Sequence, residues 1–121
     1  MCVKVLLADD AEIVRRAILN LLGDCKDIEV VGEASNFHEA LRKAEELQPD
    51  EILFDLHLAD GESEPLPTGP KVVAMSFAVD HESRLLAQSL GATKLLDKME
   101  LAHELIPTIL KVAEERGLAA S

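Results

Sequence analysis

Short runs of aliphatic residues alternate along this chain with longer segments in which apolar residues recur at helical spacing. The strand-like runs cover residues 3–8, 29–34, 51–55, 71–75 and 94–97. This alternation is typical of βαβ units, in which consecutive parallel strands are joined by helices. Right-handed crossovers then predict an α/β fold with a doubly wound, five-stranded parallel sheet whose strands lie in the order 2-1-3-4-5.

The first two helices are bounded by recognisable capping residues. Apolar residues at helical spacing follow the first run, and Gly23 ends that helix. Asn36 and Glu39 form a capping pair at the start of the second helix, which Pro49 closes. Both segments therefore have the length and boundaries of connections between parallel strands.

The connection over residues 56–70 differs from the others. It contains five helix-disfavouring residues, namely Gly61, Pro65, Pro67, Gly69 and Pro70. The third helix of the pattern is therefore predicted to be shortened or missing, with loop in its place. Further on, a helix is predicted over 80–90, stopped by Gly91, and a last helix over 101–113 with Pro107 in its first turn.

Length and charge restrict the classes of function. The 121 residues are expected to form a single domain, 1–121, with an aliphatic core, since Trp and Tyr are absent and only three Phe are present. A net charge of −11 disfavours direct binding to nucleic acid or to an anionic membrane. No signal peptide or long apolar span is recognisable, so a cytoplasmic location is expected.

Cysteine and histidine do not suggest a transition-metal site. The two cysteines and four histidines share no ligand spacing; they are Cys2, Cys25, His38, His57, His81 and His103. Packing or surface roles are the simpler interpretation for all of them.

Polar residues follow four of the predicted strands at their carboxyl ends. Asp9 and Asp10 follow the first, Asp55 ends the third, Ser76 follows the fourth and Lys98 follows the fifth. The carboxyl ends of parallel strands form the ligand crevice of such sheets. Three carboxylates there would repel unless a cation such as Mg²⁺ neutralised them, while a lysine and a hydroxyl could bind phosphoryl oxygens. The group as a whole indicates phosphoryl acceptance.

Each of these residues also has a plainer interpretation when it is taken alone. The alternatives are a helix cap at Asp9 or Asp10, loop acids at Asp55 and Asp60, a strand-end hydroxyl at Ser76 and a solvated charge at Lys98. Their joint occurrence favours the phosphoryl site.

Four segments carry a resemblance to a known family. In chain order they are VLLADDAEIVRRAI, EILFDLHLADG, VVAMSF and GATKLLDK. They resemble the acid-pair, phosphoacceptor, switch-hydroxyl and lysine motifs of response-regulator receiver domains in two-component signal transduction, and the likeness spans nearly the whole chain. It implies a flavodoxin-like fold and a phosphoprotein that acts as a switch in phosphorelay signalling.

By that likeness, Asp55 accepts the phosphoryl group from a histidine kinase or phosphotransfer protein. Asp10 and Asp55 would ligate Mg²⁺ together with the backbone carbonyl of His57, and Asp9 would act directly or through water. The resemblance implies no enzyme in the ordinary sense, but a phosphoacceptor that promotes its own phosphoryl transfer and hydrolysis.

The resemblance also assigns the output of the switch. Ser76 and Lys98 would bind the phosphoryl oxygens, and a changed surface would contact a downstream protein target. Members of the family commonly dimerise or dock through the surface that corresponds here to residues 80–90, 94–97 and 101–113.

Three departures from the family pattern bear on this output. The 56–70 segment is about two helical turns short, with Ala59 where a proline is common. Leu95 replaces the usual switch aromatic, and Met99 replaces the proline that commonly follows the lysine, which removes the sequence argument for a cis peptide.

Two classes of function therefore remain. The first is a working phospho-switch that acts through protein contacts, either as a stand-alone regulator or as a receiver excised from a longer protein. The second is a receiver-like interaction module that works without phosphorylation. A general enzyme is disfavoured, because no nucleotide-binding glycine loop and no Ser/His/Asp or Cys/His arrangement is recognisable.

Overall fold

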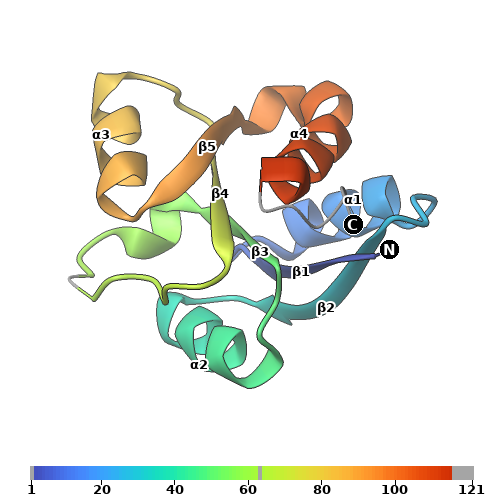
Figure 1. Cartoon of the computed structure of the whole chain (residues 1–121). Helices are drawn as coiled ribbons and strands as arrows, with labels where there is room; N and C mark the ends of the chain where they lie inside the picture. Colours follow the sequence, from blue (N-terminus) through green and yellow to red (C-terminus); the bar gives the residue numbers. More distant parts are fainter. Residues whose placement is uncertain (1, 63, 116–121) are drawn as a thin grey trace.

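The computed structural model describes residues 2–62 and 64–115, which form a central parallel sheet with helices on both faces (Figure 1). The strands are β1 (Val3–Ala8), β2 (Ile28–Ala34), β3 (Glu51–Asp55), β4 (Lys71–Ser76) and β5 (Ala92–Asp97). Their order is β2-β1-β3-β4-β5, and all neighbouring strands pair in parallel. The flavodoxin-like order predicted from the sequence is confirmed.

In the described part of the chain, four α-helices and two short 3-10 helices lie between the strands or follow the last one. The α-helices are α1 (Glu12–Leu22), α2 (Phe37–Leu47), α3 (His81–Ser89) and α4 (Leu101–Glu115), and the 3-10 helices are η1 (Leu56–Ala59) and η2 (Lys98–Glu100). Between β3 and β4 the described residues contain only η1, so the prediction of a shortened third helix is confirmed.

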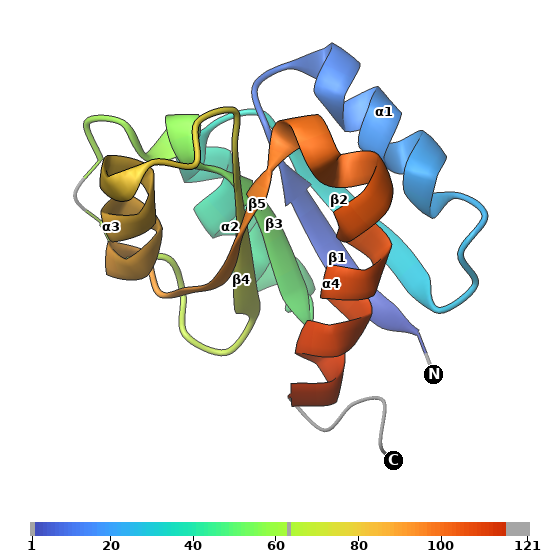
Figure 2. The same ribbon diagram turned by 90° about the horizontal axis from the view of Figure 1, so that it is seen from above.

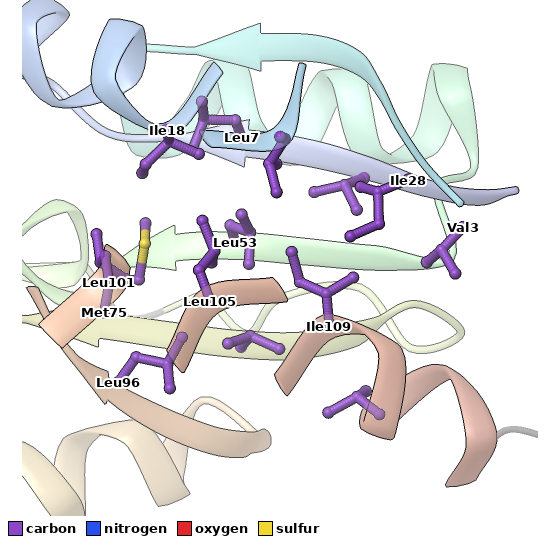
Figure 3. Close-up of a cluster of buried hydrophobic side chains, with 14 of the residues drawn as sticks. Val3, Leu7, Ile18, Ile28, Leu53, Met75, Leu96, Leu101, Leu105 and Ile109 are labelled. Atoms are coloured by element: carbon purple, nitrogen blue, oxygen red, sulfur yellow. The ribbon is translucent and has the colours of Figure 1, made fainter. Parts of the chain in front are cut away.

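The sheet separates two apolar layers, because side chains alternate along each strand. On one face, the odd-numbered core residues of β1 and β4 pack with Leu53 against α1 and α4. Figure 3 shows Leu7, Leu53, Leu105 and Ile109 meeting in this layer. On the other face, Ile52 and Phe54 pack against α2 and Leu66. Both faces of the central strands are thus covered, as Figure 2 shows from above.

The helix boundaries largely follow the predicted caps. Asn36 Oδ1 accepts the Glu39 N–H at 2.8 Å, and Glu39 Oε1 in turn accepts the Ser35 N–H at 2.8 Å. The last residue before Pro49, Gln48, has a left-handed φ of 47°. Gly23 ends α1 in a right-handed conformation, so its N–H bonds to the Leu19 carbonyl without a left-handed turn.

The predicted position of Pro107 within its helix is wrong. Pro107 lies six positions after Leu101, inside α4 and beyond its first turn. The reason is that the buried residues Leu101 and Leu105 already belong to α4, so the helix completes a turn before it reaches Pro107. Strands β2 and β5 also begin earlier than predicted, at Ile28 and Ala92, because both residues pair with a neighbouring strand.

Candidate functional site

The predicted site residues converge at the carboxyl edge of the sheet. Asp10, Asp55, Ser76 and Lys98 line one cleft of about 640 Å³. Carboxylate oxygens of Asp9, Asp10 and Asp55 lie within 4.8 Å of one another, although Asp9 and Asp55 are 46 residues apart in the chain. Parallel pairing of β1 with β3 and of β3 with β4 produces this convergence, because it aligns the ends of these strands.

Asp9 is completely buried and is held at three of its atoms. Its Oδ2 lies 2.6 Å from Lys98 Nζ, and its Oδ1 accepts the Ala11 N–H at 2.9 Å. Its backbone carbonyl accepts a hydrogen bond from Arg15 Nη1 at 2.6 Å. Asp9 is not the N-cap of α1, because that position is held by Ala11 without a side-chain cap bond. Its side chain instead closes a turn ahead of the helix and forms an ion pair inside the cleft.

Asp55 is only 4% exposed and stands at the junction of β3 and η1. Its Oδ1 accepts the His57 N–H at 3.1 Å and lies 3.3 Å from Lys98 Nζ. Burial raises the pKa of the Asp55 carboxyl, as does the nearby Asp9 carboxylate, and the His57 N–H and Lys98 oppose this shift only in part. The negative charge of the ionised Asp55 side chain is therefore only partly compensated by its neighbours.

These oxygen groups are suited to a hard divalent cation. Asp10 is exposed, so a cation bound by Asp10 and Asp55 could retain several waters, as Mg²⁺ does. The His57 carbonyl accepts the Asp60 N–H at 3.2 Å, which leaves one of its two lone pairs for a further partner. The residues present could therefore hold Mg²⁺, and its charge would offset the Asp9 carboxylate, whose repulsion adds to burial in raising the pKa of Asp55.

The hydroxyl and the lysine lie at the carboxyl ends of the next two strands of the sheet, with Ser76 at the end of β4 and Lys98 directly after β5, at the start of η2. Ser76 ends β4, and its Oγ accepts the Ala78 N–H at 3.1 Å. The Lys98 side chain is 4% exposed, and the ring of Phe77 lies over its ammonium at 5.0 Å. Such a cation–π contact helps to hold the ammonium inside the cleft.

Comparisons with known proteins agree with this geometry. The family model of the response regulator receiver domain matches residues 5–110. The chain is 35% identical over 122 residues to the response regulator protein VraR of Staphylococcus epidermidis, which covers 94% of the chain and 58% of that protein. The chain belongs to the response regulator receiver family.

Solved structures support the same fold for this receiver. The signal receiver domain of NarL from Mycobacterium tuberculosis superposes with a TM-score of 0.81 at 23% identity, covering 93% of this chain and 97% of that one. The response regulator domain of Thermotoga maritima CheB gives a TM-score of 0.75 at 23% identity, covering 92% and 96%. The chain spans little more than half the length of VraR, so the activity of such a longer protein is not transferred to it.

The departures from the receiver pattern have clear structural counterparts. Leu95 is half-buried and packs against the small apolar cluster of Leu56, Ala74 and Ala87. No cis peptide occurs in the described part of the chain, which is consistent with Met99 after Lys98.

The four histidines are all exposed. Among residues 2–62 and 64–115, no helix is long and apolar enough to cross a membrane.

Sequence reasoning did not single out Arg15, although it contacts the site directly. Its guanidinium bonds the Asp9 carbonyl and lies 3.2 Å from Glu33 Oε1 on β2. The only sequence signal is a basic residue five or six positions after the acid pair, on the first helix, which is common on any amphipathic helix.

Proposed function

We propose that this receiver is a phospho-switch in which Asp55 accepts a phosphoryl group from a histidine kinase or phosphotransfer protein. The observation that carries the proposal is the Lys98 ammonium, held 2.6 Å from Asp9 and 3.3 Å from Asp55 beside the exposed Asp10 carboxylate. A carboxylate acceptor, a fixed positive charge and a set of cation ligands are thus present in one cleft.

In this proposal, an oxygen of Asp55 forms a bond to phosphorus while the bond between phosphorus and the donor nitrogen breaks. The electron pair of that bond returns to the donor imidazole, which takes up a proton. Lys98 would neutralise charge on the phosphoryl oxygens, and Ser76 would donate its hydroxyl hydrogen to one of them. Mg²⁺, held by Asp10, Asp55 and the His57 carbonyl with Asp9 behind them, would supply further charge neutralisation.

The test is phosphoryl labelling followed by intact mass. With acetyl phosphate or a phosphorylated histidine kinase plus Mg²⁺, the wild type should gain one phosphoryl group and Asp55→Ala should gain none. Asp60→Ala is the matched control, because Asp60 lines the same cleft but lies outside the carboxylate cluster. The adduct should be released by hydroxylamine, whereas a phosphoserine at Ser76 would survive.

A second function has specific support in this structure. The crossover after Asp55 is reduced to η1, and Leu95 stands where the family carries a switch aromatic, so the usual output mechanism is altered. A receiver-like interaction module that works without phosphorylation would tolerate both changes. Failure of the wild type to gain a phosphoryl group with a range of donors and metals would favour this module, and unchanged labelling of Asp55→Ala would refute the proposed acceptor.

We further propose that the signal leaves by protein contact in the cytoplasm. The net charge of −11 disfavours nucleic acid or an anionic membrane as the direct partner of this chain. A downstream protein, or a second receiver, would dock on the face formed by α3, β5 and α4, since the Ser76 and Lys98 loops lead into these elements.

A further inference from the structure

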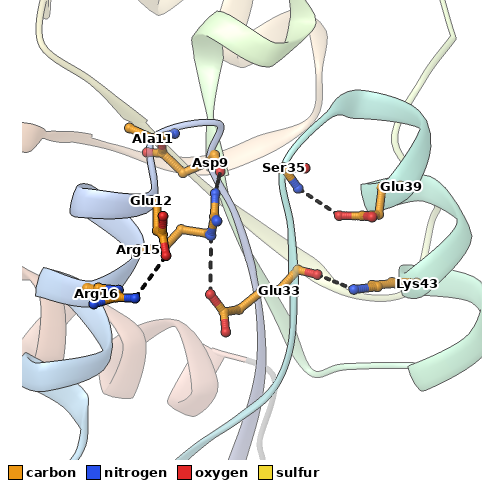
Figure 4. Close-up of polar contacts among 9 residues, drawn as sticks. All are labelled: Asp9, Ala11, Glu12, Arg15, Arg16, Glu33, Ser35, Glu39 and Lys43. Carbon is orange, nitrogen blue, oxygen red and sulfur yellow. Dashed lines mark hydrogen bonds and ion pairs between the residues drawn. The ribbon is translucent and has the colours of Figure 1, made fainter.

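Arg15 connects the acid pair to the edge of the sheet. Its Nη1 donates to the Asp9 carbonyl at 2.6 Å, and its Nε lies 3.2 Å from Glu33 Oε1. The side chain is 17% exposed, which is low for an arginine on an outer helix. Figure 4 shows the guanidinium between the end of β1 and the Glu33 side chain of β2.

These contacts fix the backbone on both sides of Asp10. The Asp9 carbonyl belongs to the peptide unit that joins Asp9 to Asp10, and Arg15 holds it. The Ala11 N–H belongs to the next peptide unit, and Asp9 Oδ1 holds that one at 2.9 Å. Because both flanking peptides are restrained, the exposed Asp10 carboxylate is presented toward Asp55 from a defined position.

The guanidinium is itself held in place from β2. Glu33 accepts from Arg15 through its carboxylate, and its backbone carbonyl accepts from Lys43 Nζ on α2 (Figure 4). Glu33 also offsets the positive charge of Arg15. Arg15 can therefore orient the acid pair while adding little repulsion to a bound cation.

We propose that Arg15 is a positioning residue that sets the cation affinity of the acid pair. The inference rests on the proposed function in that it requires Mg²⁺ to bind at Asp10 and Asp55. For the change in Mg²⁺ affinity when Arg15 is removed, the positioning role and a purely electrostatic role predict opposite signs. Removing a guanidinium near three carboxylates would strengthen cation binding if charge dominated, whereas loss of positioning weakens it.

The experiment is Mg²⁺ titration by calorimetry or by amide chemical shifts, without a phosphodonor. Arg15→Ala should weaken Mg²⁺ binding by about tenfold, the lower end of what loss of an outer-shell partner costs. Arg15→Lys keeps the charge but not the forked geometry and should recover only part of the affinity. Glu33→Gln should fall between the wild type and Arg15→Ala, because the guanidinium loses its anchor but keeps the Asp9 carbonyl.

Arg16→Ala is the matched control. Arg16 is the next residue on α1, its loss changes the net charge equally, and it pairs with Glu12 on the exposed face at 3.0 Å. Its Mg²⁺ affinity should equal or slightly exceed that of the wild type. An Arg15→Ala affinity at or above the wild-type value, or an equal loss in Arg16→Ala, would overturn the inference.

Two further measurements separate positioning from folding and from the proposed function. Thermal unfolding in EDTA should show Arg15→Ala folded at the titration temperature; if it is not, Glu33→Gln decides the question. The rate of labelling by acetyl phosphate should recover toward the wild-type value at saturating Mg²⁺, since Arg15 touches neither Asp55 nor the phosphoryl group. A wild type that binds no Mg²⁺ overturns the proposed function as well, whereas equal binding by wild type and Arg15→Ala overturns the positioning role alone.

Discussion

Asp55 is an ionisable side chain held almost entirely away from water, with a second buried carboxylate beside it. Its pKa lies above the ordinary value of 3.8, chiefly because of burial. The ionised form is thus disfavoured in the folded state, so Asp55 costs stability in full at pH values above its folded pKa. This cost shrinks as the pH falls through the folded pKa and disappears below the ordinary value of 3.8, where the carboxyl of the unfolded chain is protonated as well.

Replacing this charge should therefore stabilise the metal-free protein. At pH 7 and in EDTA, Asp55→Asn should unfold at a higher temperature than the wild type, because the amide keeps the shape of the carboxylate without its charge. Thermal unfolding followed by circular dichroism measures the difference. Asp60→Asn, an exposed acid beside the same cleft, should change the midpoint little. An Asp55→Asn midpoint at or below that of the wild type would show that Lys98 already compensates the charge.

Added Mg²⁺ should stabilise the wild type more than it stabilises Asp55→Asn. A cation that binds only the folded state raises stability by an amount that grows with its concentration over its dissociation constant. Millimolar Mg²⁺ should therefore raise the wild-type midpoint, and the increase should be smaller in Asp55→Asn, which lacks one anionic ligand. An unchanged wild-type midpoint across millimolar Mg²⁺ would mean that the site does not bind the ion in this way.

At the residue level, the sequence predicted which side chains meet but not how each is held. Asp9, Asp10, Asp55, Ser76 and Lys98 could be placed together because each follows or ends a strand of a parallel sheet. Arg15 could not, because its role depends on a glutamate 18 positions away on β2 and on a backbone carbonyl. Neither contact leaves a periodic signal.

Among the elements, α3 begins at a titratable cap. Asp80 Oδ1 accepts the Ser83 N–H at 2.8 Å, and this bond, supported by the Ser83 side chain, lowers the pKa of Asp80 below 3.8. The stabilisation that the cap supplies is present above the unfolded pKa and is lost as the pH falls through the lower folded pKa.

Carboxyl chemical shifts should accordingly show Asp80 titrating below pH 3.8. Amide exchange at Ser83 should accelerate over the same range as the cap is protonated. Asp80→Asn keeps an acceptor oxygen without a titration, so its Ser83 exchange should lack this step. A normal titration of Asp80 would mean that the cap bond does not persist in solution.

Pro107 lies inside helix α4, where it is expected to lower the stability of the protein. A proline inside a helix removes one backbone hydrogen bond and crowds the preceding turn. Pro107→Ala should therefore raise the free energy of unfolding by about 1–3 kcal/mol, after a partial offset from the more flexible unfolded chain. Urea denaturation measures this gain. Pro65→Ala, in the loop after η1, is the control and should not stabilise. A destabilised Pro107→Ala would mean that the proline is required where it stands.

The early starts of β2 and β5 illustrate why element boundaries were less predictable than element types. Periodicity identified the four α-helices of the described residues, including the start of α4 at Leu101. The first residues of β2 and β5 depend instead on pairing with a neighbouring strand, which is not a local property of the sequence.

For the whole molecule, phosphorylation should change the face built by α3, β5 and α4. With Leu95 in place of an aromatic, we expect the change to begin with the Ser76 loop, including Phe77, which lies over Lys98. Hydrogen exchange should show altered protection in residues 76–91 and 94–98 after labelling. Asp55→Ala treated identically should show none. Changes confined to residues 56–70 would place the output surface elsewhere.

Lys98→Ala tests whether the Lys98 ammonium transmits the effect of phosphorylation to this face. The variant should still accept a phosphoryl group on Asp55 but lose much of the protection change, because a charge partner is removed while the acceptor carboxylate remains. A full protection change in Lys98→Ala would show that the ammonium does not transmit the signal.

Strand order and the missing third helix were both predictable from the sequence, since they follow from the alternating pattern and from five glycines and prolines in one connection. The residue that covers this part of the sheet in place of a helix was not predictable from the sequence. Leu66 is buried at 6% exposure against the α2 face, yet a single leucine among prolines has no periodicity to mark it.

Because the sheet keeps its two apolar layers apart, they should behave as separate thermodynamic units: paired substitutions such as Ile109→Val on one side and Leu66→Ala on the other should have additive effects on unfolding. The same separation bears on evolution. One layer could lose a helix without repacking of the layer that holds α1 and α4. The cleft stands on loops at the strand ends, so the chemistry could be inherited intact while the covering of one side was rebuilt.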